Sequence, residues 1–167
     1  YSFTFQFKVD STAPTMNNVS TSSTGKYTNS STYVSASDSM SGVDAIYMKT
    51  PGSSSYGNMG TSTTVSSSGM NGLYSFYAKD KAGHISRTYF LYLDTVKPTG
   101  TIKNSNGAEI TGSYTNQAFS YSATDSGSGI SYLQYKKPGS SSWLTYTSGT
   151  SISASAASGT YQFRSVD

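Results

Sequence analysis

Apolar and polar residues alternate along short stretches of this chain with a period of two. The alternation is clearest in FTFQFKV (3–9), AFSYSA (118–123) and YQF (161–163). A period of two predicts strands that bury one face. Gly, Pro, Ser and Asp separate these stretches at intervals of about 8–12 residues, a spacing typical of an antiparallel sandwich. No stretch combines helical periodicity with a capping residue, so we predict an all-β protein.

The chain contains two copies of one pattern. A shift of 87 residues aligns 27–80 with 114–167 without a gap, and 22 of the 54 aligned positions are identical. YTN, PGSSS and the final Asp recur in both copies. Upstream of this region the offset is 84, where VDSTAPT (9–15) matches LDTVKPTG (93–100). Such self-similarity indicates a tandem array of one structural unit.

The repeat sets the expected domain boundaries. Residues 10–93 form the first repeat, and 94–167 form a second repeat that is truncated before its last strand. FQFKVD (5–10) matches YFLYLD (89–94), so residues 1–9 are expected to be the final strand of a preceding repeat.

Each repeat is expected to contain the same set of strands. In the first repeat these lie near 15–20, 31–37, 43–49, 55–59, 62–67 and 73–79, with a seventh at 86–93. In the second they lie near 99–104, 118–124, 130–136, 142–147, 150–155 and 160–166.

Composition narrows the class of protein. Hydrophobic residues make up 34% and charged residues 11%, but 15 Tyr and 7 Phe favour a folded chain with an aromatic core. The absence of Cys excludes disulfides and thiolate chemistry. The net charge of +3 comes from scattered Lys and Arg, so no nucleic-acid partner is expected. No apolar run approaches the roughly 20 residues of a membrane helix, so no membrane insertion is expected.

Catalytic constellations are not evident in the sequence. His84 is the single His of the chain, so a Ser-His-Asp triad in each repeat is impossible. A lone turn His is more commonly a solvated loop residue than a base. The Gly-rich DSGSG (125–129) lacks the Lys of a phosphate-binding loop. We therefore expect a protein that is not an enzyme and needs no cofactor.

Four motifs carry a family resemblance: VDSTAPT, ATDSGSGI, YKKPGSSSW and AKDKAGH. Together they resemble the tandem immunoglobulin-like (Big-type) repeats of bacterial surface and secreted proteins, although His84 stands where that family usually has Asn. The resemblance implies two tandem immunoglobulin-like antiparallel β-sandwich domains, the second lacking its own final strand. It also implies an extracellular structural spacer, stalk or adhesion module, with neighbouring repeats as partners. The alternatives are a module that binds glycan or a host protein, and accessory domains of a secreted hydrolase.

Six of the seven Asp fall at equivalent positions of the two repeats. These pairs are Asp10 with Asp94, Asp38 with Asp125, and Asp80 with Asp167. In an immunoglobulin-like sandwich the three segments that carry them lie at one pole, so three carboxylates should converge in each repeat. One hypothesis is that Ca²⁺, which takes hard oxygen ligands, stiffens the junction there, as it does in some members of the resembling family. The more common alternative is that each Asp caps the N–H groups of its own turn.

Tyr56 and Trp143 occupy equivalent positions after PGSSS. An exposed aromatic ring can stack on a sugar, so both are candidate glycan contacts. The alternative, which is more common for a large aromatic residue, is that Trp143 covers the edge of the core.

Residues 1–9 also suggest self-association. Phe3, Phe5, Phe7 and Val9 share one face of a strand. Donated to the second repeat of a neighbouring molecule, this strand would give head-to-tail assembly by β-augmentation. The alternative is that the segment stays unpaired or docks locally.

Overall fold

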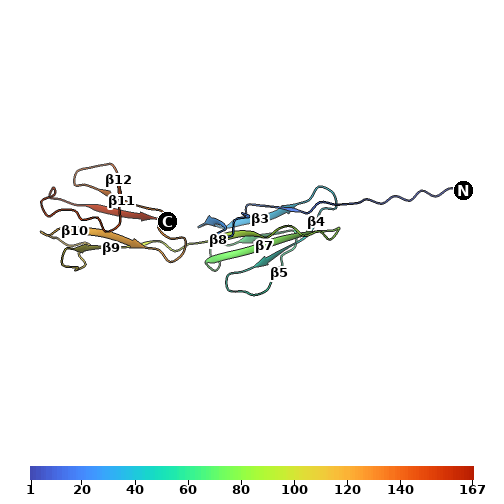
Figure 1. Cartoon of the computed structure of the whole chain (residues 1–167), viewed down its shortest axis with the longest axis horizontal. Helices are drawn as coiled ribbons and strands as arrows, with labels where there is room; N and C mark the ends of the chain where they lie inside the picture. The colour runs from blue at the N-terminus through green and yellow to red at the C-terminus, as the bar shows by residue number, and fades with distance from the viewer. The chain divides into compact units, whose positions relative to one another are not determined.

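The computed structural model describes all 167 residues and contains strands, turns and loops but no helix, so the all-β prediction is confirmed. No segment forms a helix of the length and apolarity that a membrane span requires. The chain divides into two compact units, residues 1–95 (unit 1) and 96–167 (unit 2), which are described separately (Figure 1).

Unit 1 contains eight strands. They are β1 (Thr15–Asn17), β2 (Lys26–Thr28), β3 (Thr32–Ser37), β4 (Val43–Lys49), β5 (Gly57–Asn58), β6 (Ser62–Val65), β7 (Gly72–Asp80) and β8 (Tyr89–Leu93). One sheet has the order β1-β3-β6, and the other has the order β2-β8-β7-β4-β5. Every pair is antiparallel except β2 with β8.

The core of unit 1 lies between these two sheets, an arrangement consistent with a β-sandwich. Strand β7 shows how the sequence builds it, because Tyr74, Phe76 and Ala78 alternate inward and are at most 4% exposed. Leu91 and Leu93 of β8 are completely buried beside them. Met16, Val34 and Val65 contribute from the other sheet, and Ile46 comes from β4.

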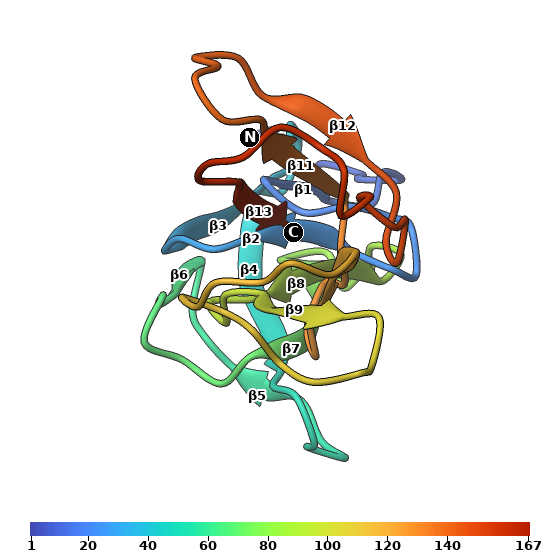
Figure 2. The ribbon, with the colours of Figure 1, turned by 90° about the vertical axis from the view of Figure 1, so that its left-hand side faces the viewer.

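Unit 2 contains five strands: β9 (Thr99–Asn104), β10 (Phe119–Thr124), β11 (Tyr132–Lys136), β12 (Leu144–Tyr146) and β13 (Gln162–Val166). They form a sheet of order β12-β11-β13 and a second sheet that pairs β9 with β10. Figure 2 shows β11, β12 and β13 on one side of β9. The buried core consists of Tyr121, Leu133 and Tyr146, with Phe163 and Tyr135 packed against it.

The two units pair their strands in the same register. Tyr47 lies opposite Tyr77 in unit 1, and Gln134 lies opposite Arg164 in unit 2, each residue 87 positions further along. The pair Tyr47–Asn58 likewise corresponds to Gln134–Thr145. The internal repeat of the sequence is therefore also a repeat of backbone hydrogen-bonding pattern.

The structure differs from the prediction in three features. The strand expected at 150–155 is a single bridge between Ile152 and Phe119; at positions equivalent to β6, Gly149 and Ser151 replace Ser62 and Thr64, which lowers the β propensity. The short strand β2 was not predicted. Residues 1–9, expected to be a strand, pair with nothing in the chain and leave unit 1 as an extended tail (Figure 1).

Candidate functional site

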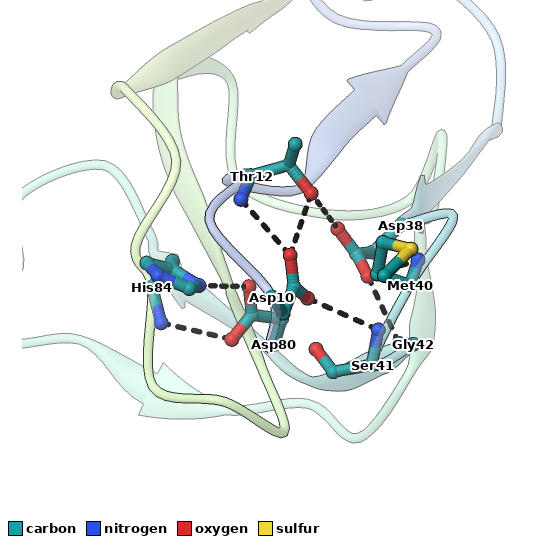
Figure 3. Close-up of polar contacts among 8 residues, drawn as sticks. All are labelled: Asp10, Thr12, Asp38, Met40, Ser41, Gly42, Asp80 and His84. Atoms are coloured by element: carbon teal, nitrogen blue, oxygen red, sulfur yellow. Dashed lines mark hydrogen bonds and ion pairs between the residues drawn. The ribbon is translucent and has the colours of Figure 1, made fainter. Parts of the chain in front are cut away.

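Two loops of unit 1 and the segment that enters it bring acidic side chains together (Figure 3). Asp10 precedes β1, Asp80 ends β7, and His84 lies in the turn that follows β7. Each contributes an atom to a group in which all atoms lie within 4.8 Å of one another. We call these residues, together with Thr12, Asp38 and Ser41, the acidic pole.

Asp10 fixes the entering segment to the loop between β3 and β4. Its Oδ1 accepts hydrogen bonds from the Thr12 amide (2.9 Å) and hydroxyl (2.7 Å), and its Oδ2 accepts one from the Ser41 amide (3.0 Å). The Ser41 hydroxyl lies beside the carboxylate without forming a hydrogen bond. The Ser41 side chain and these donors hold the pKa of Asp10 well below its usual range.

Asp38 closes its own loop. Its Oδ1 accepts the amides of Met40 (3.1 Å) and Gly42 (2.9 Å), and Gly42 has the positive φ of 78° that favours glycine. Its Oδ2 lies 3.5 Å from the Thr12 hydroxyl, which also donates to Asp10. Thr12 thus links the two carboxylates.

Asp80 is the most deeply buried acid of the pole, with 1% of its surface exposed. Burial raises its pKa, but hydrogen bonds from His84 outweigh burial and the net shift is downward. The His84 amide donates to Oδ1 (2.8 Å), and its ring Nδ1 lies 2.9 Å from Oδ2. His84, expected to be a solvated loop residue, therefore orders the turn after β7. The i,i+4 spacing in DKAGH was the one sequence signal for this contact.

The equivalent acids of unit 2 repeat part of this arrangement. Asp125 Oδ1 accepts the amides of Gly127 and Gly129, each at 2.9 Å, as Asp38 does 87 residues earlier. Its Oδ2 is buried and has no hydrogen-bond partner. An oxygen of Asp167 lies within 4.8 Å of Asp125. Asp94 is buried at the end of β8 in unit 1, and its amide donates to the Thr28 carbonyl.

The hydrogen bonds of the acidic pole establish a capping role. Asp10, Asp38 and Asp80 each accept at least two, so peptide N–H groups compensate much of their charge. Their remaining oxygen lone pairs are the ligands that Ca²⁺ prefers, whereas the His84 nitrogen suits transition metals better. Calcium binding stays a prediction that titration can decide.

The aromatic candidates lie on the sheet face opposite the core. Tyr56 packs edge-on against Tyr77 at 4.9 Å between ring centroids, and Tyr77 stacks on Tyr47 at 4.8 Å. Lys49 Nζ lies 5.4 Å from the centre of the Tyr56 ring. Tyr47 and Tyr77 alternate with the core residues of β4 and β7, so this cluster faces outward.

Unit 2 keeps these positions but changes their chemistry. The ring of Trp143 has Arg164 Cζ at 4.3 Å and Lys136 Nζ at 4.8 Å from its centre. Arg164 also donates to the Gln134 side chain through Nε (2.8 Å). Trp143 is half-buried in this cluster and is not part of the core. The contact of Arg164 with the Trp143 ring in unit 2 thus takes the place of the contact of Tyr77 with Tyr56 in unit 1.

Comparisons with models of protein families, with curated proteins and with solved structures find no match to this chain.

Proposed function

We propose that the chain consists of two tandem immunoglobulin-like repeats that act as a non-catalytic spacer or adhesion stalk of a bacterial extracellular protein. The observation that carries this proposal is the shared register of the two units, in which residues 87 positions apart occupy the same places in the β-ladders. The duplicated feature is thus the scaffold itself. Repeating a scaffold lengthens a protein, and length is the property that a stalk requires.

The topology of unit 1 suits a protein under tension. Strand β2 runs parallel to β8, with Tyr27 opposite Tyr92. The segment before β2 adds an antiparallel bridge between Ser20 and Phe90, with two hydrogen bonds at 2.9 and 2.7 Å, which a pull from the N-terminal side loads before it reaches β2. A force that pulls β2 toward the N-terminus and β8 toward the C-terminus slides these two parallel strands along each other. Such sliding strains the hydrogen bonds between β2 and β8 together, which resists force better than breaking the bonds one after another.

Single-molecule force spectroscopy tests this proposal. We expect the variant Ser20→Pro, which removes one of the hydrogen bonds to Phe90, to lower the unfolding force of unit 1 by a larger fraction than its free energy of unfolding. The matched control Ser53→Pro lies in the loop between β4 and β5, away from the β2–β8 pairing, and also removes one amide donor. Equal effects of the two variants on the unfolding force would contradict a role in resisting tension.

A second candidate function, glycan binding, depends on Trp143. Its ring lies on the outer face of a sheet, where a saccharide can approach it without entering the core. A glycan array probed with the chain and with Trp143→Ala tests this function. Binding that Trp143→Ala abolishes would support recognition, whereas the spacer proposal expects no bound glycan.

A further inference from the structure

The outer face of the sheet β12-β11-β13 gathers positive charge around one aromatic ring. Arg164 of β13 and Lys136 of β11 both lie over the ring of Trp143, with Cζ of the first at 4.3 Å and Nζ of the second at 4.8 Å from its centre. The Gln134 side chain accepts a hydrogen bond from Nε of Arg164 at 2.8 Å and another from its Nη2. We call these four residues the cationic cluster.

The cluster holds its two cations close together. Two like charges beside one ring repel each other. The ring offsets part of this repulsion, because the negative face of an aromatic ring attracts a cation. An anion bound to both side chains removes the rest and forms charge-assisted hydrogen bonds, which are stronger than neutral ones. The arrangement therefore attracts a negatively charged group.

The neighbours of the cations within the sheet are neutral. Strand β11 is central, so β12 and β13 flank Lys136 on its two sides. Lys136 lies opposite Gln162 of β13. Gln134 lies between Thr145 of β12 and Arg164 of β13. Amide and hydroxyl groups thus flank the two cations, and none of them carries a compensating charge.

The acidic residues of unit 2 lie elsewhere. Glu109 forms an isolated bridge to β9, which belongs to the other sheet. Asp125 accepts the amides of its own loop, and an oxygen of Asp167 lies within 4.8 Å of it. Neither Arg164 nor Lys136 forms an ion pair in the structure. None of these acids is therefore the negative partner of the cationic cluster.

Unit 1 shows that the scaffold does not require these charges. Tyr77 occupies the position of Arg164, and Tyr47 occupies that of Gln134. These two rings stack at 4.8 Å between centroids, and Lys49 is the cation over the neighbouring ring. Stacked rings thus fill the same places of the same β-ladder. Arg164 and Gln134 are features of unit 2 that the fold itself does not demand.

We propose that the cationic cluster binds a carboxylate group of an acidic saccharide. Gln134 fixes one edge of the Arg164 guanidinium, and the outer N–H groups of Nη1 and Nη2 remain free for the paired hydrogen bonds that a carboxylate accepts. Lys136 adds a second positive charge at the same ring. The proposal rests on the glycan-binding candidate, whose ligand class it specifies, and does not depend on the spacer function.

The surroundings of the cluster match the rest of a sugar ring. The amide of Gln162 and the hydroxyl of Thr145 are exposed and can form hydrogen bonds with saccharide hydroxyl groups. Trp143 is half-buried, so part of its ring is accessible to the apolar C–H groups of a sugar. Two cations match one carboxylate, whereas a nucleic acid requires a longer track of positive charge. A uronic acid combines the carboxylate, the hydroxyl groups and the apolar face in one residue.

Calorimetric titration of the full chain tests the ligand class. We expect oligogalacturonate, a chain of uronic acids, to bind at least about tenfold more tightly than the neutral maltohexaose, which cannot form charge-assisted hydrogen bonds. Arg164→Tyr, which introduces the residue that unit 1 has at this position, should remove most of this difference. Arg87→Tyr makes the same exchange in unit 1 and is the matched control, which should bind like the unchanged chain. Equal losses in the two variants would overturn the proposal.

The second cation gives an independent test that leaves the hydrogen bonds of Gln134 in place. Lys136→Gln should weaken the binding of oligogalacturonate, whereas Lys49→Gln, the equivalent change in unit 1, should not. The fluorescence of Trp143 should change on binding, since the single Trp of the chain lies in the cluster. Binding that alters neither the emission nor responds to Lys136→Gln would place the ligand elsewhere and overturn the site.

The remaining outcomes separate this proposal from glycan binding in general. Tight binding of maltohexaose that Trp143→Ala abolishes and Arg164→Tyr leaves intact would overturn the acidic ligand class but support the glycan-binding candidate. Binding of neither saccharide would overturn both. Poly-L-glutamate, which carries carboxylates without sugar rings, should bind more weakly than oligogalacturonate, and an equal affinity would overturn the saccharide as the ligand.

Discussion

Units 1 and 2 share one hydrogen-bonding pattern but fill their cores differently. Unit 1 buries Val34 and Ile46 beneath Leu91 and Leu93, all completely excluded from solvent. The core of unit 2 depends on aromatic rings such as Tyr121 and Tyr146, whose ring centroids lie 6.2 Å apart. The comparison shows that strand register tolerates a change of core chemistry.

One pair of core positions, filled by side chains of different size in the two units, illustrates this tolerance. In unit 1, Met16 and Val34 fill neighbouring positions of the β1–β3 sheet. Gly100 and Tyr121 occupy the equivalent positions of unit 2, and a Cβ at Gly100 would overlap the Tyr121 ring. A large residue paired with a small one replaces two of intermediate size, and the Tyr121 ring occupies the space that a side chain at position 100 would need.

The largest expected loss of stability comes from removing the equivalent Phe ring in each unit. Phe76→Ala should destabilise unit 1 by about 3–5 kcal/mol, because a completely buried ring is lost. Phe163→Ala should cost unit 2 about 2 kcal/mol, since that ring is already partly exposed to water. Urea denaturation can separate the two units, because the single Trp of the chain, Trp143, reports on unit 2 alone. Equal losses would contradict the difference in burial.

The second-largest expected loss of stability comes from substituting Gly100. Gly100→Ala should destabilise unit 2 by about 1–3 kcal/mol, because the added methyl group displaces the Tyr121 ring. Tyr121→Val provides room for it, so the double variant should lose less than the sum of the single changes, measured by Trp143 fluorescence in urea. Additive losses would show that the two positions do not share one space.

Acidification should weaken unit 1 through its acidic pole. Folding lowers the pKa of both Asp10 and Asp80 from the ordinary value of 3.8. A lowered pKa contributes stability that is present above 3.8 and is lost as the pH falls through the folded-state pKa. The urea midpoint of unit 1, followed by tyrosine circular dichroism, should fall below pH 4, and Asp10→Asn should make this fall shallower. Asp44→Asn, at an exposed position outside the pole, is the control and should leave the slope unchanged.

Substitution in the outward-facing cluster around Trp143 should reduce the stability of unit 2 by a smaller amount. Arg164→Ala should destabilise unit 2 by about 0.5–1 kcal/mol, the usual range of a cation–π contact near the surface. It should also shift the emission of Trp143, whose ring it uncovers. Lys103→Ala, which removes a cation elsewhere in unit 2, is the control. No change in emission on Arg164→Ala would mean that the two side chains are not in contact in solution.

The smallest expected effect is that of calcium. Because amide donors already compensate the carboxylates of the acidic pole, we expect millimolar Ca²⁺ to leave the melting temperature of unit 1 unchanged. An increase that Asp10→Asn abolishes would instead establish calcium binding at this site.

Several features of the site could not be predicted from the sequence. Threading the repeat onto a sandwich predicted that Asp10, Asp38 and Asp80 would converge, and the structure brings all three into the acidic pole. His84 was missed because its ring contact with Asp80 requires the closed turn after β7. The partners of Trp143 were also missed. Arg164 is far from Trp143 in the sequence, and only the pairing of β11 with β13 brings it over the ring.

The pattern of residues was sufficient to predict the all-β class and the duplication. Alternation with a period of two fixes which side chains share a face, and a shift of one residue would expose the whole set, so residues 87 positions apart keep one register. Three-dimensional contacts determine that Ile152 remains a single bridge and that β2 forms beside β8. These features depend on whether a partner strand lies alongside, and a local pattern of residues contains no information about its neighbour in space.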